Sequence, residues 1–508
     1  MQLLDCTLRD GGYYTNWNFP QNLVKEYLYT VSKLPISIVE LGYISDNPDM
    51  NGPFYHLNSN ILSEARKILN KNQKIFVMIN AKEIKNFAQL KKLISNKKKY
   101  LDGIRFAISP NQIDKFIKIL QPVKRHFPKI SFNLNLMYFS KWVNDIDFFN
   151  QALKKLTNKI DTLAIVDSYG SIFPEQTRNF LKSINRTKLK LGCHFHNNCG
   201  LALANTLAAI SEGCSIADAT FKGMGRGAGN AETELMLAIS YRKKNKISGF
   251  DINSLLEKFE KMKIDMKWGT SYAYAYAATE GYSQSHMMDL IQKRRLDPGA
   301  AVKVISSAEN HVKEIGFENL KIWKNIIKNK EIPILIGGAP SLLDYGKILF
   351  QKIGVKLPLI LSGSNALFNF YKLNLKIKNP IILILSGSEI KKINSYKERN
   401  ILKKINIKII VAEKNFLLEK INFKNKNIIF SNSLAINPLL LAGLVLNKLK
   451  IKKMNIAFFD GETSTLKGRT MMKETLESVK ILQNKKIKIF KLTQSFLPVQ
   501  FINPWIND

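Results

Sequence analysis

The sequence predicts an α/β protein in which a TIM (β/α)8 barrel is followed by a helical segment and a C-terminal Rossmann-like, doubly wound α/β domain. Short apolar strands alternate with amphipathic helical stretches eight times within the first 245 of the 508 residues, and a second series of apolar runs follows residue 326. Eight strand–helix units in that length fit a closed barrel better than an open doubly wound sheet, which is the alternative. We expect the barrel over residues 1–245, a helical extension and linker over 246–325, and the second domain over 326–508.

Each expected barrel strand is a short run rich in β-branched and other apolar residues. The eight runs cover residues 3–8, 36–44, 74–80, 103–108, 130–138, 161–168, 189–197 and 216–224. Amphipathic stretches such as 21–34, 174–184 and 200–213 separate them and are typical of the outer helices. In a barrel of this kind, the chemistry is expected where the strands end and the loops begin.

The second domain is predicted from apolar runs that mostly end in small polar residues, at 332–341, 357–366, 381–389, 408–413, 427–433 and 454–463. Buried parallel strands have this pattern, and ligands of such sheets bind beyond the strand C-termini. A nucleotide, coenzyme A or a sugar phosphate is therefore a candidate ligand of this domain. A purely structural or oligomerising role is the alternative, and we expect a homo-oligomer.

The net charge of +37 raises the question of nucleic-acid binding. Residues 301–508 hold 35 lysines and arginines against 14 aspartates and glutamates, which places 21 of the 37 excess positive charges there. These lysines are scattered singly among isoleucine and asparagine, with no aromatic-studded basic stripe and no zinc finger. The pattern favours a solvated basic surface over a nucleic-acid site and leaves attraction of anionic substrates open.

No apolar run approaches the length of a membrane span, and the chain enters strand-like sequence at once, so we expect neither a transmembrane segment nor a signal peptide. The four cysteines, Cys6, Cys193, Cys199 and Cys214, form no CxxC motif. Unpaired cysteines favour reduced thiols and a cytoplasmic location.

Two of the six histidines lie two residues apart in "CHFHNNCG", residues 193–200, at the end of the seventh expected strand. Because side chains alternate along a strand, His194 and His196 point to one face, and Cys193 and Phe195 point to the other. Two imidazoles on one face need only a carboxylate to form a facial triad around a divalent ion. Barrel closure brings the first strand within one strand of the seventh, so Asp10, just after the first strand, supplies that carboxylate.

Four segments in barrel order resemble one family: "LLDCTLRDGGYY", "DSYG", "CHFHNNCGLALANTLAAI" and "DATFKGMGRGAGNAETE". Over residues 1–300 they are similar to the metal-dependent lyases and aldolases whose barrels open with a D-x-T-L-R-D-G motif. That superfamily includes 4-hydroxy-2-oxovalerate aldolase, hydroxymethylglutaryl-CoA lyase and the isopropylmalate and homocitrate synthases. The resemblance implies a carbon–carbon lyase or synthase.

Carried over position by position, the resemblance makes Asp10, His194 and His196 ligands of the divalent metal and Asn230 a further ligand. It places Arg9 beside an enolate oxygen and Ser168 near a keto-acid carboxylate. The donor set suits Mn²⁺, Mg²⁺, Zn²⁺ or Fe²⁺. We favour Mn²⁺ or Mg²⁺, with Zn²⁺ as an alternative.

The residue that transfers the proton is a departure from the family pattern. The aldolases carry a histidine general base after R-D-G and the synthases a glutamate, whereas this chain has Gly12 and then Tyr13 there. Tyr13 is our candidate acid or base, and lining the pocket is its alternative role. Tyr14, Glu40 and His286 are further candidates for proton transfer.

Three more polar residues lie in or at the ends of expected strands. Glu40 is assigned to the catalytic set, either near the ligand or holding an arginine. Arg105 is a candidate substrate clamp or an interior ion-pair partner, and Asp167, beside Ser168, joins the substrate-binding set.

These residues together predict a divalent-metal-dependent aldolase or lyase that acts through an enolate of pyruvate or a similar 2-oxo acid. An acyl-CoA-dependent Claisen-type synthase is the alternative. A non-catalytic binding or assembly protein that uses the C-terminal domain is the third possibility.

Overall fold

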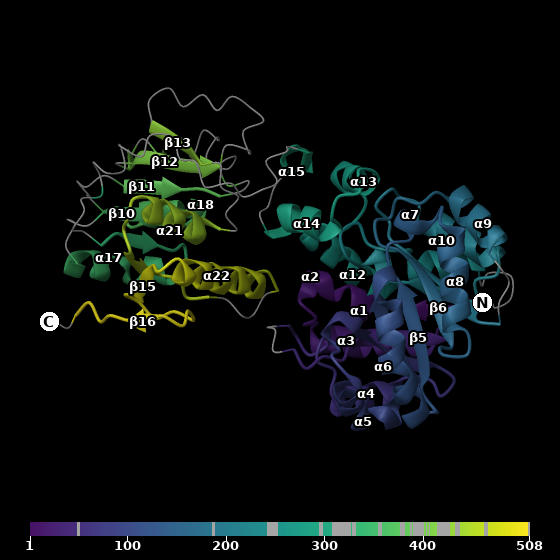
Figure 1. Cartoon of the computed structure of the whole chain (residues 1–508). Helices are drawn as coiled ribbons and strands as arrows, with labels where there is room; N and C mark the ends of the chain where they lie inside the picture. The colour runs from purple at the N-terminus through teal and green to yellow at the C-terminus, as the bar shows by residue number, and fades with distance from the viewer. Residues whose placement is uncertain are drawn as a thin grey trace. The chain divides into compact units, whose positions relative to one another are not determined.

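A computed structural model of the chain describes residues 1–47, 51–184, 188–240, 252–293, 298–306, 327, 332–353, 358–375, 381–386, 389, 401–402, 404–405, 407–413, 427–431, 437–461 and 466–505. They divide into two compact units, Met1–Met288 and Asp289–Asp508 (Figure 1). Of the expected helical extension and linker over 246–325, residues 246–251, 294–297 and 307–325 lie outside the described residues, so its boundaries stay a prediction.

The first unit contains the predicted barrel: eight parallel strands in sequence order, closed by pairing of the first with the last. The strands are β1 (Gln2–Asp5), β2 (Ile38–Tyr43), β3 (Lys74–Asn80), β4 (Gly103–Ile108), β5 (Ser131–Leu136), β6 (Thr162–Asp167), β7 (Lys190–Phe195) and β8 (Ile216–Ala219). Every residue of β2 and of β6 is buried, as expected for strands covered on both faces. The closed barrel excludes the open-sheet alternative for this unit.

Amphipathic helices follow the strands and cover the barrel. They are α1 (Thr7–Asp10), α2 (Gly12–Thr15), α3 (Gln21–Ser32), α4 (Ser59–Ile68), α5 (Phe87–Ser95), α6 (Ile113–His126), α7 (Phe139–Trp142), α8 (Ile146–Leu156), α9 (Pro174–Ser183), α10 (Ala202–Ser211) and α11 (Thr233–Ser240). Three more helices of this unit are α12 (Asn253–Met266), α13 (Tyr272–Thr279) and α14 (Gln284–Met288). Asparagine and aspartate begin several of them: the side chains of Asn58, Asn86 and Asp145 accept backbone N–H bonds in the first turn of α4, α5 and α8.

Strands β1 and β8 are shorter than the sequence predicts, and this shapes the site. The Oδ1 of Asp5 accepts the N–H of Thr7 at 3.0 Å, so the chain leaves the sheet and begins α1 at Thr7. Strand β8 ends at Ala219, and Lys222 lies in the left-handed region at φ 51°. The chain therefore continues as the helix α1 after β1 and as a short 3-10 helix and a loop after β8, instead of as longer strands.

The second unit contains an eight-stranded parallel sheet in the order β13-β12-β11-β10-β9-β14-β15-β16. Its strands are β9 (Ile334–Ile336), β10 (Leu359–Ser362), β11 (Ile381–Ile384), β12 (Ile407–Glu413), β13 (Asn427–Ser431), β14 (Lys453–Ala457), β15 (Lys488–Lys491) and β16 (Gln500–Phe501). The strand order reverses between β9 and β14, which makes the sheet doubly wound. All six expected runs contain a strand, whereas β15 and β16 were not predicted.

The helices of this unit are α15 (Pro298–Ser306), α17 (Ser341–Ile353), α18 (Gly363–Lys372), α21 (Pro438–Lys448) and α22 (Leu466–Asn484). Helix α17 packs with α18, and α21 packs with α22. Helix α21 is apolar on all sides and buries every residue from Leu439 to Leu446, as expected of a helix enclosed on all faces.

The two units have separate hydrophobic cores among the described residues. The core of the barrel unit runs from Leu3 to Trp268, and that of the second unit from Ile327 to Leu497. No described helix is both long and apolar enough to cross a membrane.

Candidate metal centre

The barrel brings the three predicted metal ligands together at the C-terminal ends of its strands. Asp10 lies in α1 directly after β1, His194 lies in β7, and His196 follows β7 by one residue. One ligand atom from each lies within 4.8 Å of the others, and Asp10 Oδ2 is 3.7 Å from His194 Nε2. The imidazole rings of His194 and His196 lie 5.1 Å apart, nearly perpendicular to each other. All three side chains are buried.

Asn230, the fourth predicted ligand, reaches the same cluster from the loop after β8. It pairs with His196 in an isolated antiparallel bridge, and its Nδ2 donates to Asp10 Oδ2. Its Oδ1 is buried and has no hydrogen-bond partner. A buried acceptor without a donor is costly, and a bound cation would satisfy it.

The protonation states of Asp10 and His196 are those that a metal ion needs. Burial raises the pKa of Asp10, but the charges of Arg9, His194 and His196 and the amide of Asn230 outweigh it and hold the pKa well below its usual range. Burial, together with the positive charge of Arg226, lowers the pKa of His196 well below its usual value. An ionised carboxylate and a neutral imidazole are both ready to coordinate a cation, so the donor set fits a divalent metal.

Arg9 is held rigidly beside these ligands. Its Nε donates to Glu40 Oε2 at 2.6 Å, its Nη1 donates to Asp10 Oδ1 at 2.5 Å, and its carbonyl accepts Trp17 Nε1 at 2.8 Å. Glu40 is fully buried and reaches Arg105 Nη1 at 3.5 Å as well. The Nη2 of Arg9 is buried without a partner. The Nη2 group of Arg9 is therefore free to donate to a negative charge that develops next to the metal ligands.

Asp218, which the sequence did not single out, contacts the predicted metal ligand His194. Its Oδ2 lies 3.0 Å from His194 Nδ1 and accepts Arg105 Nη2 at 2.7 Å. Burial raises the pKa of Asp218, but Arg105 and His194 together lower it, so the group is ionised. A carboxylate at Nδ1 orients a ligating histidine and increases its basicity. Asn197 and Asn198, which follow the two histidines in the sequence, have other partners: Asn197 Oδ1 accepts the N–H of Ala202, and Asn198 Nδ2 donates to Gln284 Oε1.

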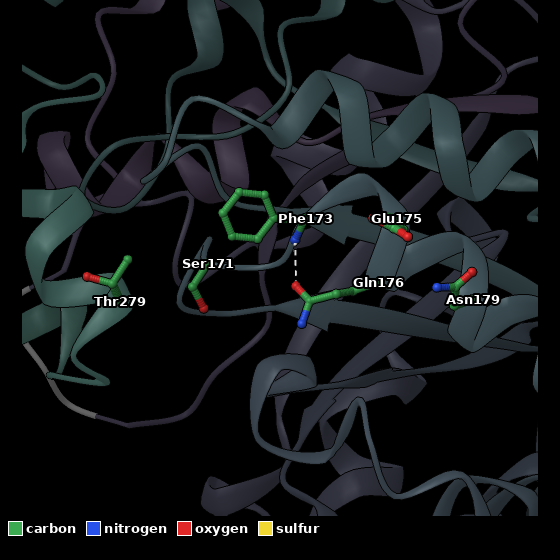
Figure 2. A pocket seen from close by; sticks show the side chains of 6 residues that line it. All are labelled: Ser171, Phe173, Glu175, Gln176, Asn179 and Thr279. Atoms are coloured by element: carbon green, nitrogen blue, oxygen red, sulfur yellow. Dashed lines mark hydrogen bonds between the residues drawn. The ribbon is translucent and has the colours of Figure 1, made fainter.

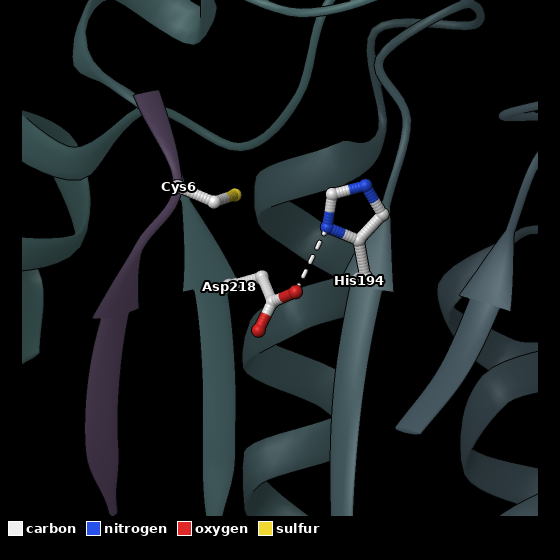
Figure 3. A group of neighbouring side chains, drawn as sticks. All are labelled: Cys6, His194 and Asp218. Atoms are coloured by element: carbon white, nitrogen blue, oxygen red, sulfur yellow. Dashed lines mark hydrogen bonds and ion pairs between the residues drawn. The ribbon is translucent and has the colours of Figure 1, made fainter. Parts of the chain in front are cut away.

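Cys6, His194 and Asp218 form a second group of side chains with metal-ligand atoms in reach (Figure 3). Two observations argue against a separate ion there. Arg105 already donates to the Asp218 oxygen that faces His194, and burial raises the pKa of the Cys6 thiol well above its usual value. We interpret Cys6 and Asp218 as residues that surround the ligand His194 of the Asp10–His194–His196 centre.

Comparisons with known proteins agree with this site. The model of the family described as HMGL-like matches residues 102–261, which include both histidines and Asn230. The crystal structure of the N-terminal domain of a Bacteroides vulgatus protein, provisionally assigned as an aldolase, is 34% identical and superposes with a TM-score of 0.52 over 57% of this chain and 96% of that one. The barrel unit belongs to the HMGL-like family.

Curated relatives of this HMGL-like protein are lyases and aldolases. An oxaloacetate decarboxylase of Mycobacterium tuberculosis is 22% identical over 302 residues, which cover 59% of this chain and 86% of that protein. A 4-hydroxy-2-oxovalerate aldolase of Pectobacterium atrosepticum is 24% identical over 260 residues, which cover 50% of this chain and 73% of that protein. The family's lyases and aldolases depend on a divalent metal, and this chain is an enzyme of that class.

Two of the predicted substrate-binding residues of this HMGL-like enzyme lie at the end of β6: Asp167 is its last residue, and Ser168 follows it. Ser168 Oγ accepts the N–H of Tyr138 at 3.1 Å, and its carbonyl accepts Arg226 Nη2 at 3.2 Å. Asp167 Oδ2 accepts the N–H of Ile172 at 3.0 Å, while its Oδ1 is buried without a partner. Burial raises the pKa of Asp167 to about 6. Asp167 thus holds the loop that carries Ser168, and the substrate roles of both residues stay predictions.

Tyr13 and its neighbours form the aromatic part of the site. The ring of Tyr13 lies 5.0 Å from that of Trp17, and the guanidinium of Arg226 lies 5.7 Å from the Tyr13 ring centroid. Tyr43, which the sequence did not single out, is buried, and burial together with Tyr13 raises its pKa well above the usual value. Tyr14 instead donates to the carbonyl of Gly227 at 2.6 Å. Tyr13 therefore remains the candidate for proton transfer.

A separate pocket lies beside the start of α9. It has a volume of about 500 Å³ and is lined by Ser171, Phe173, Glu175, Gln176, Asn179 and Thr279 (Figure 2). Gln176 Oε1 accepts the N–H of Phe173 at 2.9 Å within it. None of the predicted site residues lines this pocket, and it has no cluster of charged side chains that would suit the family's chemistry.

Proposed function

We propose that this enzyme cleaves or forms a carbon–carbon bond through the enolate of pyruvate or a similar 2-oxo acid. The observation that carries the proposal is the juxtaposition of an ionised Asp10 and a neutral His196 with an arginine that keeps one buried donor free. Aldol cleavage next to a carbonyl needs stabilisation of the negative charge that develops on the carbonyl oxygen.

Asp10, His194 and His196 would hold the metal, with Asn230 Oδ1 as a further ligand. A divalent ion in that position supplies Lewis-acid polarisation of the substrate carbonyl. Arg9, fixed by Glu40 and Asp10, directs its free Nη2 toward the enolate oxygen. Tyr13 transfers the proton, and burial keeps the neighbouring Tyr43 protonated at neutral pH.

The test is hydrogen–deuterium exchange at the methyl group of pyruvate, followed by NMR in D₂O with Mn²⁺ or Mg²⁺ and then with a chelator. Enolisation is the half-reaction that this proposal requires, and it needs no knowledge of the second substrate. We expect exchange that depends on the metal and disappears in Arg9→Ala.

Arg9→Lys serves as the matched variant. It keeps the positive charge but loses the planar fork that contacts Glu40 and Asp10 together, so we expect retained metal binding with an exchange rate about 10²-fold lower. Absence of exchange in the metal-loaded wild-type protein would rule out the 2-oxo-acid enolate and favour an acyl-CoA donor.

We propose Mn²⁺ or Mg²⁺ as the metal, with Zn²⁺ as the alternative. Support comes from the ligand set of one carboxylate, two imidazoles and one amide oxygen, with no cysteine among the predicted ligands. The rates of pyruvate methyl exchange after each ion is added to the metal-free protein would show which metal supports the reaction best.

For the second unit we propose a Rossmann-like domain that binds a nucleotide, coenzyme A or a sugar phosphate. The strand order reverses between β9 and β14, the place where such sheets bind ligands. There, Gly337 donates to the carbonyl of Ala457 at 2.8 Å, and Ser341 Oγ donates to Asp460 Oδ1 at 2.7 Å. A shift in melting temperature of the full chain with ATP, coenzyme A or UDP-glucose would test this.

We also propose a homo-oligomer located in the cytoplasm. The four cysteines form no disulfide, which supports a reducing compartment. Light scattering of the purified chain would determine the oligomeric state.

A further inference from the structure

Arg226 lies in the loop after β8 and is a third arginine at the mouth of the barrel. Its Nη2 donates to the carbonyl of Ser168 at 3.2 Å, and its guanidinium lies 5.7 Å from the centroid of the Tyr13 ring. Its Nε is buried and has no hydrogen-bond partner. The side chain is half-buried overall.

Arg226 differs from the other two arginines of the site in its charge partners. Arg9 pairs with Asp10 and Glu40, and Arg105 pairs with Asp218 and Glu40. Arg226 forms no ion pair with any carboxylate among the described residues of the chain. A guanidinium whose Nε is removed from water without an anion is unfavourable, and its fork of donors matches a carboxylate.

The loop places Arg226 next to the metal ligands. A methyl group built on the preceding residue, Gly225, would lie 2.3 Å from Asn230 Nδ2 and 2.8 Å from Asp10 Oδ2. The backbone before Arg226 thus touches two of the predicted ligands. A metal ion held by these ligands and the guanidinium of Arg226 would repel each other, and an anion bound to both would offset that repulsion.

We propose that Arg226 binds the carboxylate of the 2-oxo acid and so selects acids over their esters and amides. This inference rests on the proposed function, because it assumes that a 2-oxo acid binds at the metal centre. The partner-free Nε and the remaining donors of the fork face the carboxylate, while the bond from Nη2 to Ser168 fixes the orientation of the guanidinium. Arg226 is therefore a specificity-determining residue.

The test uses oxalate, a small dianion that resembles the pyruvate enolate, and the full chain loaded with Mn²⁺. Calorimetry gives the oxalate Kd for wild type, Arg226→Ala, Arg226→Lys and, as a matched control, Arg178→Ala, which removes an exposed arginine from α9. We expect Arg226→Ala to weaken oxalate binding by about tenfold to a hundredfold, the usual loss for a charge-assisted hydrogen bond. The oxalate Kd of Arg226→Lys should lie between those of wild type and Arg226→Ala, and the oxalate Kd of Arg178→Ala should match wild type.

Two further readouts separate recognition from a structural role. In pyruvate methyl exchange, Arg226→Ala should raise KM by a similar factor with kcat changed less than threefold, and its Mn²⁺ affinity should be no weaker than that of wild type, because the variant removes a positive charge near the ligands. An unchanged oxalate Kd in Arg226→Ala, or a parallel loss of Mn²⁺ binding, would overturn the inference. Wild-type protein that binds Mn²⁺ but shows no exchange would instead overturn the proposed function.

Discussion

At the scale of single residues, the sequence was most informative where chemistry limits the choice of side chain. His194, His196 and Asp10 were predicted from strand alternation and barrel closure, and the structure brings them within 4.8 Å of one another. Asp218 and Arg226 were missed because their environments depend on tertiary contacts. Asp218 resembles any aspartate in a strand until the fold brings His194 and Arg105 to it.

A substitution of Asp218 tests how strongly a residue that contacts a metal ligand, but not the metal, affects metal affinity. Asp218→Asn keeps the shape but removes the charge that orients His194, so we expect Mn²⁺ affinity to fall by about 10–100-fold with an unchanged fold. Electron paramagnetic resonance of free Mn²⁺ measures this. Asp114→Asn, at an exposed ion pair with Lys155, is the control. Equal Mn²⁺ affinity in both variants would contradict the role of Asp218.

Asp167 makes stability depend on pH. Burial raises its pKa to about 6 in the folded protein, above the ordinary value, so its ionisation costs stability as the pH rises and the full cost is present above pH 6. Asp167→Asn carries no such cost. Relative to that variant, the free energy of unfolding of wild type should fall by about 1 kcal/mol between pH 5 and pH 7.5, measured with urea. If the free energies of unfolding of wild type and Asp167→Asn differ by the same amount at both pH values, Asp167 does not titrate as described.

At the scale of elements, the eight barrel strands were predicted because each is a short apolar run between helical patterns. The ends of β1 and β8 were not predicted correctly, because a side chain, Asp5, ends β1 by bonding to the backbone of Thr7. Strands β15 and β16 were missed because Lys488 and Lys491 interrupt the apolar pattern in β15 and β16 has only two residues.

The glycine-rich loop after β8 packs closely against two predicted metal ligands, so we expect an added side chain at Gly225 to displace them. Gly225→Ala would place a methyl group 2.3 Å from Asn230 Nδ2, so we expect loss of Mn²⁺ binding while the melting temperature changes little. Gly192→Ala in β7 is the matched control, because its new methyl group would meet Ala164 Cβ at 3.4 Å, an ordinary contact distance. Normal Mn²⁺ binding in Gly225→Ala would show that the loop can move away without cost to the site.

At the scale of the whole molecule, the prediction of a barrel followed by a parallel sheet is confirmed. The exact boundaries between the parts stay predictions, because residues 246–251, 294–297 and 307–325 of the expected linker lie outside the described residues. Among the residues that the structure describes, the hydrophobic cores of the two units share no member, which is typical of domains that fold independently.

Separate cores predict that residues 1–293 alone keep the metal centre. We expect this fragment to bind Mn²⁺ with an affinity within about threefold of the full chain, because the predicted ligands all belong to the first unit. Circular dichroism would confirm that the fragment is folded before the titration. A folded fragment that binds no Mn²⁺ would mean that the second unit completes the site.

The central claim is that a divalent metal ion binds between Asp10, His194 and His196. Anomalous diffraction at the manganese edge, from crystals of the full chain grown with Mn²⁺, tests it most directly. We predict one strong peak within coordination distance of Asp10 Oδ2 and of a ring nitrogen of each histidine, with Asn230 Oδ1 turned toward it. A peak among Cys6, His194 and Asp218 instead, or no peak in the barrel, would contradict the account.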